Sequence, residues 1–446
     1  MPSPPDTTRL PRPPGDPEAT ADPDAYRRWA QRRVMRALVI TQIFGGAGLA
    51  AGVSVGALLA EDLLGSTRGA GLPAALFTAG AAGAAIGVGW LSERCGRRPG
   101  LAVGYAVGAA GGAGVVLAAA TEHVPLLLAS LMVYGAGSAT NLQCRYAGAD
   151  LVHESHRGRA VSTVLVATTL GAVAGPNLLQ VTGDLAVAVD LPRLSGPFVL
   201  ASAVYAIAGA VTAALLRPDP LLTARRLDAV GLDLAHPPAV PVDETPWGSV
   251  ASSAAPSTWW QRRRPLVLAA TGMVLAQAVM VAVMTMTPVH LEDHGHGLDA
   301  VGLIIGLHIG AMYLPSPVTG RLVDRFSPSA ITAAGGVVLV TAALAAGAAG
   351  SSTRTLGVAL VLLGIGWNLS LVGGTALVTN LTTLADRART QGSVDLGVAL
   401  AGAAGGLSSG AVVAAAGFRA LGLVAAGLAG LITLSVLRVR RRAQAS

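Results

Sequence analysis

Long apolar stretches alternate with short polar segments along most of the chain. From residue 37 onwards, about twelve apolar stretches follow one another, separated by loops that carry Arg, Asp, Ser and Pro. A bilayer core about 30 Å thick is crossed by a helix of about 20 residues, and lipid tolerates only helices and closed barrels as spanning structures. The pattern therefore predicts an all-α integral membrane protein with about twelve transmembrane helices. We place these spans at residues 37–60, 72–91, 100–120, 124–147, 160–182, 197–216, 265–288, 299–320, 330–350, 355–378, 391–414 and 417–437.

The spans divide into two groups of six. The first half covers residues 36–216 and the second covers 265–438, with a Pro-, Ser- and Asp-rich linker at 217–264. Residues 1–35 are rich in Pro, Asp and Arg and lack an apolar segment, so we expect a disordered tail there. A short tail at 439–446 ends the chain. Because six is an even number, both tails and the linker are predicted on one side of the membrane.

The charged residues indicate which side this is. Only 12% of the residues are charged, against about 25% in soluble domains, and all 31 basic residues are Arg. Of these, 26 fall on the side of the tails and the linker and four on the other. Because positive residues favour the cytoplasmic side, we predict a multi-pass protein of the cytoplasmic (inner) membrane with both termini cytoplasmic. The Arg clusters form no continuous stripe, so lipid is the expected partner and nucleic acid is excluded.

A short motif occurs once in each half, 231 residues apart. Residues 89–94 read Gly-Trp-Leu-Ser-Glu-Arg and residues 320–325 read Gly-Arg-Leu-Val-Asp-Arg. With its continuation to residue 98, the first copy resembles the signature loop of the major facilitator superfamily, Gly-x-Leu-x-acid-Arg-x-Gly-Arg-basic. The positions that carry this resemblance are Gly89, Glu93, Arg94, Gly96, Arg97 and Arg98 in the first copy and Gly320, Asp324 and Arg325 in the second.

The resemblance implies the major facilitator fold, in which two pseudo-symmetric six-helix halves enclose a binding site near the midplane. It also implies a cytoplasmic gate and function as a monomer. Glu93 would sit over the amino end of span 11 and Asp324 over the start of span 5, where free N–H groups favour negative charge. The neighbouring Arg94, Arg97 and Arg325 would pair with these acids or with Asp150 and Asp386. The alternative is a pair of simple positive-inside loops.

A second resemblance lies in span 5. Residues 171–176 read Gly-Ala-Val-Ala-Gly-Pro, and Gly171, Gly175 and Pro176 match the Gly-x-x-x-Gly-Pro element of proton-driven antiporters. This implies export against protons. The alternative is close helix packing with a proline kink, because small residues four apart let membrane helices approach anywhere.

Arg145, Asp395 and His308 are ionisable residues inside predicted spans, where charge is costly and indicates function. Arg145 lies late in span 4 and shares a helical face with Asn141. It would bind an anionic substrate or tune a carboxylate, unless it snorkels to the cytoplasmic interface. Asp395 in span 11 is the best candidate for protonation, with Arg145 or His308 as partner, although it equally fits the gate network beside Glu93. His308 in span 8 would exchange a proton or form a neutral hydrogen bond between helices.

Other polar residues extend the candidate set. Gln42, Gln277 and Asn368 lie in spans that line the cavity in the superfamily, where they would bind substrate or join helices. The loop after span 7 contains His290, His294 and His296 with two acids, which is able to hold a metal ion but follows no metal-site spacing. A solvated loop is the alternative, and we expect no metal or other cofactor.

The leading functional hypothesis is a secondary active transporter that works by alternating access. It would couple proton entry to efflux of drug-like or amphipathic metabolites, with Asp395, Arg145 or His308 exchanging the proton, so that its partners are a small-molecule substrate and protons. A proton symporter for uptake is the alternative within the same fold. A non-transporting membrane sensor or scaffold is the alternative of another class, but it needs a folded cytoplasmic domain that neither tail nor linker predicts. No catalytic constellation is present, so we predict that the protein is not an enzyme.

Overall fold

The structure is a computed structural model that describes residues 22–64, 72–231, 259–295 and 298–443. These residues form helices and connecting turns. The first half contains α1 (Pro23–Leu64), α2 (Leu72–Cys95), α3 (Arg97–Ala120), α4 (Val124–Ala149), α5 (Arg157–Asn177), α6 (Leu179–Ala188) and α7 (Gly196–Leu215), with short 3₁₀ helices at Glu154–His156 and Arg193–Ser195. After α8 (Pro220–Ala229), the second half contains α9 (Trp259–Asp293), α10 (Leu298–Tyr313), α11 (Ser316–Phe326), α12 (Pro328–Gly347), α13 (Thr353–Asn380) and α14 (Arg387–Ala443).

These helices account for the predicted spans. Eight helical stretches among the described residues are long and apolar enough to cross a membrane, and the last of them, 387–435, covers two spans. The helices α1, α4 and α5 supply the remaining three. Lipid-facing leucines and valines are exposed along many of these helices, as expected where the surrounding solvent is hydrocarbon.

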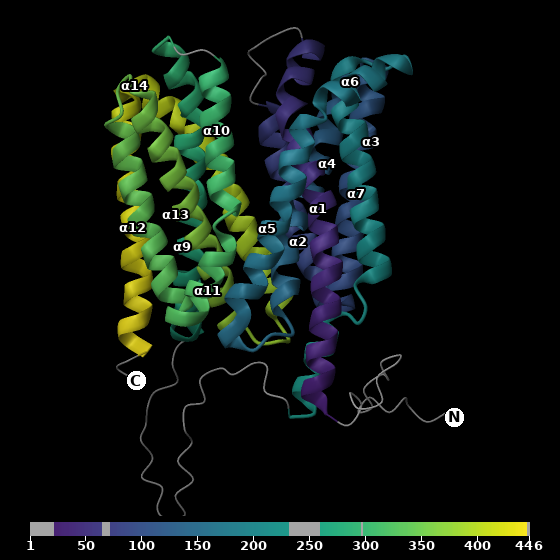
Figure 1. Cartoon of the computed structure of the whole chain (residues 1–446), viewed down its shortest axis with the longest axis vertical. Helices are drawn as coiled ribbons and strands as arrows, with labels where there is room; N and C mark the ends of the chain where they lie inside the picture. Colours follow the sequence, from purple (N-terminus) through teal and green to yellow (C-terminus); the bar gives the residue numbers. More distant parts are fainter. Residues whose placement is uncertain (1–21, 65–71, 232–258, 296–297, 444–446) are drawn as a thin grey trace, which may run out of the picture.

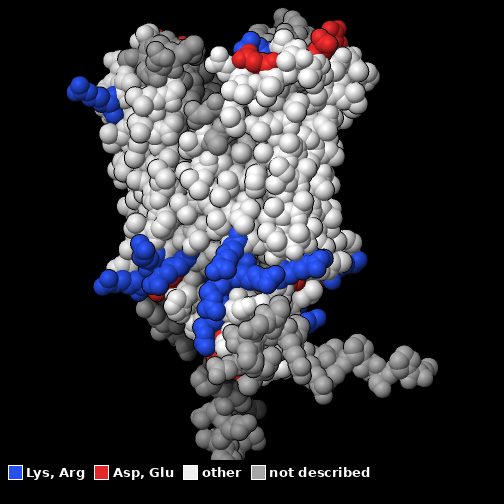
Figure 2. Space-filling model, turned by 45° about the vertical axis from the view of Figure 1, so that its right-hand side comes forward, with Lys and Arg blue, Asp and Glu red and all other residues white. Residues whose placement is uncertain are grey.

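The helices form two bundles that stand side by side (Figure 1). The N-terminal half, α1 to α7, and the C-terminal half, α9 to α14, each have their own apolar core. The beginning of α1 and the end of α14 lie at the same end of the molecule (Figure 1). Basic side chains gather at that end, and an uncharged band covers the middle of the face in view (Figure 2). We call the end of the molecule that carries these basic side chains the arginine-rich end.

The halves meet mainly where α2 packs on α14 and α5 packs on α11. A glycine of each motif copy makes this approach possible. A Cβ atom on Gly89 would lie 2.9 Å from the carbonyl oxygen of Ala388, and one on Gly320 would lie 2.6 Å from that of Gly158. Both distances are too short for a real side chain, so glycine lets the helices of opposite halves touch through their backbones.

Three expectations from the sequence need correction. The tail does not extend to residue 35, because α1 begins at Pro23 and buries Tyr26, Ala30 and Val34 at helical spacing. Residues 1–21 lie outside the described residues. The linker is not unfolded at its start, because α8 packs an apolar face on the N-terminal half, and α9 already begins at Trp259.

Two spans predicted as continuous are broken in the structure. Span 5 divides into α5 and α6 at Leu178, and span 8 divides into α10 and α11 just before Ser316. Conversely, spans 11 and 12 are joined within α14, whose backbone turns at Gly417 with φ of 80°. Glycine adopts this positive φ without strain, which allows a reversal with almost no loop.

Candidate functional site

A buried ion pair joins the two halves. Nη2 of Arg145, on α4, lies 2.6 Å from Oδ1 of Asp395, on α14. The arginine side chain is 0% exposed and the aspartate 3%. Arg145 therefore does not snorkel to the interface, and of the partners considered for Asp395 the structure selects Arg145. Because removing two charges from water is expensive, such a pair persists only when hydrogen bonds satisfy it well.

The guanidinium of Arg145 is fully hydrogen-bonded. Nε donates to Oγ1 of Thr375 at 2.9 Å, and Nη1 donates to the carbonyl of Leu142 and, at 3.4 Å, to Oδ2 of Asp395. Nη2 donates to Oδ1 of Asp395 and, at 3.0 Å, to the hydroxyl of Tyr146, which itself lies 3.3 Å from Oδ1. Three helices therefore hold one salt bridge in one geometry.

The ion pair borders a cavity of about 220 Å³ between the halves. Helices α2 and α4 line it on one side, and α9 and α14 line it on the other. Its wall is largely apolar and includes Phe77, Leu142 and Val281. Asp395 and Gln277 are the polar exceptions that matter most here, because they bring a carboxylate and an amide to the same space. A molecule in this cavity would touch one member of the ion pair.

Gln277 reaches the cavity in a fixed orientation. Its Oε1 accepts a hydrogen bond from Nε1 of Trp367 at 2.7 Å, and the indole packs edge-on against Tyr313. The amide nitrogen is thereby left as a donor, for which the described residues show no acceptor. Gln277 is recognisable from the sequence, whereas the role of Trp367 depends on a contact between α9 and α13.

Gln42, Asn141 and Asn368 join helices within their own halves. Nδ2 of Asn141 and the hydroxyl of Tyr105 both donate to Oε1 of Gln42, at 3.0 and 3.2 Å. Nδ2 of Asn368 donates to the carbonyl of Met312 and to Oγ of Ser316, both at 2.7 Å. All three amides are buried. The geometry thus favours the alternative that these residues join helices. Asn141 bonds to Gln42 and is not among the hydrogen-bond partners of Arg145.

His308 also lies away from the ion pair. Its Nδ1 is 2.8 Å from the carbonyl oxygen of Leu360. A carbonyl only accepts, so Nδ1 carries the hydrogen, and the buried Nε2 has no hydrogen-bond partner among the described residues. The geometry matches the alternative of a neutral histidine that links α10 to α13.

At the arginine-rich end, both motif acids cap helices of the opposite half. Oε2 of Glu93 accepts the backbone N–H of Arg389 at 3.0 Å, in the first turn of α14. Asp324 accepts the backbone N–H groups of Gly158 at 2.8 Å and Arg159 at 3.2 Å, at the start of α5. These are the contacts expected from the sequence, and they favour the negative charge through the free N–H groups of each helix.

A second buried ionic cluster lies beside the Glu93 contact. Nε of Arg97 lies 2.8 Å from Oδ2 of Asp150, and Arg97 also donates to the side chain of Gln391 across the interface. Nη1 of Arg387 lies 3.9 Å from Oδ1 of the same aspartate. The side chains of Arg97, Arg387, Asp150 and Gln391 are all buried. Inside this cluster two guanidinium groups share the one carboxylate of Asp150.

The other motif arginines behave differently from the expectation. Arg94 lies over the ring of Trp90 at 4.0 Å and Arg325 over that of Phe326 at 5.6 Å. The described residues show no ion pair for either, nor for Asp386. The backbone N–H of Arg98 instead donates to Oδ2 of Asp219 at 2.7 Å. Next to it, Gly96 forms the turn between α2 and α3 with φ of 96°, which only glycine adopts readily.

One residue of this gate could not be identified from the sequence. Arg225, on α8, donates to the carbonyls of Leu384 at 2.9 Å and Ala385 at 2.9 Å in the C-terminal half. It also donates to the carbonyl of Glu93 at 3.0 Å in the N-terminal half. All its partners are backbone atoms more than a hundred residues away, so no residue pattern signals them. The start of the linker therefore binds both halves where they close.

The remaining candidates are less informative. Gly171 packs against α1, where a Cβ atom would collide with the carbonyl of Ile43, which fits the packing alternative for this element. Gly175 is buried, and the side chain of Pro176 lies outside the described residues. His296 also lies outside them. Among the described residues, which exclude His296, no group of three side chains is placed to hold a metal ion.

Comparison with known proteins places the chain among membrane transporters. The family model described as Major Facilitator Superfamily matches residues 37–367 and 270–446. The chain is 50% identical over 407 residues to the uncharacterized MFS-type transporter YdeG of Bacillus subtilis (strain 168), with 91% of both proteins covered. It is 32% identical over 368 residues to the riboflavin transporter RfnT of Brucella anthropi, covering 82% of this chain and 85% of that protein.

Solved structures agree in fold. The human organic anion transporter MFSD10 superposes with a TM-score of 0.68 at 18% identity, covering 91% of this chain and 99% of that one. The fucose:proton symporter FucP of E. coli gives a TM-score of 0.63 at 15% identity, covering 91% of this chain and 98% of that one. At such low identity these similarities describe the architecture alone.

Proposed function

The chain belongs to the major facilitator superfamily of secondary transporters, and we propose that it couples proton movement to export of a small amphipathic molecule. The observation that carries this proposal is the buried Arg145–Asp395 pair, which joins the halves and borders the cavity between them. A carboxylate that meets both a buried cation and the cavity is able to exchange a proton against an occupant. We also propose that the arginine-rich end is cytoplasmic, with both termini there, in the cytoplasmic membrane.

The mechanism follows from the charge balance of the pair. Protonation of Asp395 neutralises one partner and weakens its attraction to Arg145, which loosens a contact between α4 and α14. Because these helices belong to opposite halves, the protonation state biases how the halves sit against each other. The acid caps at Glu93 and Asp324 hold the cytoplasmic side closed in the present conformation, and each is worth about 0.3–2 kcal/mol. Contacts of this size bias a two-state equilibrium without locking it.

The cavity suggests what is carried. Its apolar wall favours a molecule with a substantial apolar surface, and the oriented amide of Gln277 favours one with a hydrogen-bond acceptor. Riboflavin, which gives its name to the 32% identical relative, is a compound of this kind and is the first candidate to test. Export rather than uptake rests on the resemblance of Gly171, Gly175 and Pro176 to the antiporter element, and not on the packing of Gly171 against α1.

Transport in inverted membrane vesicles tests the proposal. The vesicle interior is acidified and riboflavin, followed by a diverse compound panel, is added outside. A proton-coupled exporter moves the compound inward while protons leave, so an internal pH indicator reports alkalinisation. The Asp395→Asn variant should insert normally, lose this signal and retain exchange of labelled for unlabelled compound.

The Asp190→Asn variant is the matched control. It removes a carboxylate at an exposed position with φ of 59°, a conformation that asparagine tolerates well, and it should transport like the parent protein. Undiminished proton-coupled export in the Asp395→Asn variant would overturn the assignment. Compound entry only when the vesicle exterior is made acidic would contradict export and support symport.

A further inference from the structure

A second cavity lies within the C-terminal half, at the end opposite the arginine-rich end. Its volume is about 840 Å³, and the ends of α9 and α12, the loop after α12 and the part of α14 from Gly417 onwards line it. All its described lining residues belong to this half. It is therefore separate from the cavity beside Asp395. The cavity lies against α12 and the last part of α14, which stand on the side of the C-terminal half that is far from the N-terminal half (Figure 1).

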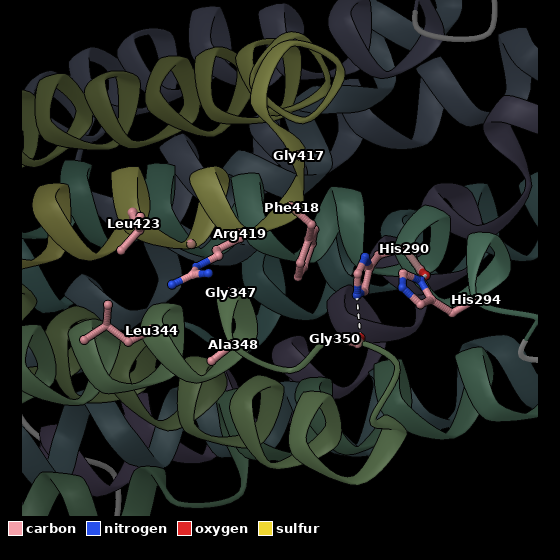
Figure 3. Close-up of a pocket in the computed structure, with 11 residues that line it drawn as sticks. His290, His294, Leu344, Gly347, Ala348, Gly350, Gly417, Phe418, Arg419 and Leu423 are labelled. Atoms are coloured by element: carbon pink, nitrogen blue, oxygen red, sulfur yellow. Dashed lines mark hydrogen bonds between the residues drawn. The ribbon is translucent and has the colours of Figure 1, made fainter.

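The rim of this cavity is polar and rigid. His290 stacks on Phe418, with ring centroids 4.2 Å apart and an angle of 13° between the planes. Nε2 of His290 is 2.9 Å from the carbonyl oxygen of Gly350, which fixes the hydrogen on Nε2 (Figure 3). Nδ1 of His294 is 2.7 Å from the carbonyl oxygen of His290. The imidazoles are thus held by backbone carbonyls at the mouth.

Arg419 supplies an unbalanced positive charge below this rim. The described residues show neither an ion pair nor a hydrogen bond for its side chain, and none of the described residues that line the cavity is a carboxylate. By contrast, Arg193 at the same end of the molecule pairs with Asp184 at 2.8 Å. In Figure 3 the guanidinium of Arg419 extends along the cavity toward Leu344 and Leu423, away from His290. The geometry therefore leaves a cation aimed into open space.

Apolar side chains continue the cavity toward the middle of the membrane. Leu344 precedes the end of α12 by about one turn, and Leu423 follows Arg419 by about one turn. Both are well exposed, at 45% and 59%, on a surface that the bilayer covers. Between them the helices touch at Gly347 and Gly422, where a Cβ atom on Gly422 would lie 2.7 Å from Cα of Gly347. Two glycines in contact leave a furrow instead of a ridge.

We propose that this cavity binds a phospholipid, with the headgroup phosphate at Arg419 and an acyl chain in the furrow beside Leu344 and Leu423. The polar rim, the single cation and the apolar furrow follow one another in the order of headgroup, phosphate and chain. A soluble anion would use the cation but not the leucines, whereas a lipid uses both. With the proposed orientation of the protein, the lipid belongs to the outer leaflet.

Lipid retention measured by native mass spectrometry tests the proposal. The full chain is purified in detergent and incubated with phosphatidylglycerol. The parent protein should retain one lipid molecule. The Arg419→Gln variant should retain the lipid about fivefold more weakly, which is the effect of one arginine on an anionic lipid. Arg354→Gln is the matched control, because Arg354 is an exposed arginine of the same half outside the cavity, and it should retain lipid like the parent.

Two further probes separate the sources of the phosphate. Glycerol 3-phosphate offers the anion without chains, and dioleoylglycerol offers the chains without phosphate, so neither should be retained or compete with phosphatidylglycerol. Competition by glycerol 3-phosphate alone would overturn the lipid assignment in favour of a soluble anion. Equal retention by the parent and Arg419→Gln would overturn the site.

Two further variants keep the test independent of folding. Arg419→Lys keeps the positive charge and should retain the lipid, whereas Leu423→Gln keeps Arg419 but makes the furrow polar and should lose part of the retention. If Leu423→Gln retains lipid as well as the parent does, the furrow is not the chain site.

Discussion

Two buried ionic clusters join the halves, and they differ in charge balance and in surroundings. Arg145 and Asp395 form a one-to-one pair whose guanidinium is fully hydrogen-bonded and whose carboxylate borders a cavity. In the second cluster Arg97 and Arg387 share Asp150, and three of their buried nitrogens have no hydrogen-bond partner among the described residues. Neither cavity described above is lined by this cluster.

The difference separates coupling from closure. A balanced pair next to a cavity is able to lose its attraction when one proton arrives and to regain it when the proton leaves. A cluster with two cations and one anion that lines neither of these cavities depends on its single carboxylate for its counter-charge. The first arrangement suits a proton-exchanging site, and the second suits a structural contact that holds the arginine-rich end closed.

Neutralising Asp150 should have the largest effect on stability. The Asp150→Asn variant leaves two buried guanidinium groups without a counter-charge, which we expect to cost about 3–5 kcal/mol. Thermal unfolding in detergent, followed by loss of monodisperse protein, measures the effect. Asp190→Asn should unfold like the parent. If Asp150→Asn unfolds like the parent as well, the cluster is not an essential structural contact.

Removing the linker contact should shift the conformational equilibrium by a smaller amount. Arg225→Ala loses hydrogen bonds to three carbonyls in both halves, a loss of about 1–2 kcal/mol that favours opening at the arginine-rich end. With Cys95 and Cys144 replaced by serine, a cysteine at the buried position of Ala388 reports this opening. We expect its labelling by a thiol reagent to become about fivefold to thirtyfold faster.

Arg226→Ala is the control for that experiment. Arg226 is the exposed neighbour on the same helix, and the described residues show no hydrogen bond from its side chain to the other half. Equal acceleration by both variants would assign the effect to the charge of α8 and would contradict the specific role of Arg225.

Neutralising either motif acid should have a weaker effect of the same kind. Glu93→Gln and Asp324→Asn keep an acceptor for the helix N–H groups but lose the charge, at a cost of about 0.3–1 kcal/mol each. Labelling at position 388 should therefore accelerate by less than in Arg225→Ala. In the double variant the two free-energy costs should add, so that the two accelerations multiply. Slower labelling in either variant would contradict the capping account.

Replacing His308 should have the smallest effect on coupling. His308→Asn keeps a donor for the carbonyl of Leu360, and the residue touches neither the ion pair nor the cavity beside it. The rate of transport should therefore change by less than about fivefold at any pH, since a buried hydrogen bond alone is worth about 1 kcal/mol. A displaced pH profile would move the coupling site away from Asp395.

The sequence predicts the fold and the acids of the gate well because their signals are local. Apolar length marks the spans, and a carboxylate at a helix end has its partners in the N–H groups of any nearby helix start, as Glu93 and Asp324 show. Arg145 and Asp395 are recognisable as charges inside apolar spans. Which partner Asp395 takes is not, because the choice between Arg145 and His308 depends on how the halves face each other.

The contacts that escape prediction are made by residues whose partners carry no side-chain signal. Arg225 binds only backbone carbonyls, and Trp367 orients Gln277 across two helices. The helical start at Pro23 and the folded α8 escape prediction because amphipathic turns in a Pro-rich context resemble disordered chain. Tertiary packing on the N-terminal half, not local propensity, stabilises both.

Proton release on ligand binding tests the central account most directly. The purified protein is placed in weakly buffered detergent solution with a pH-indicator dye, and the compound identified by the vesicle screen is added. If Asp395 exchanges its proton against the occupant of the adjacent cavity, the parent protein releases a proton on binding and the Asp395→Asn variant binds the compound without release. Proton release that persists in the Asp395→Asn variant would contradict the account.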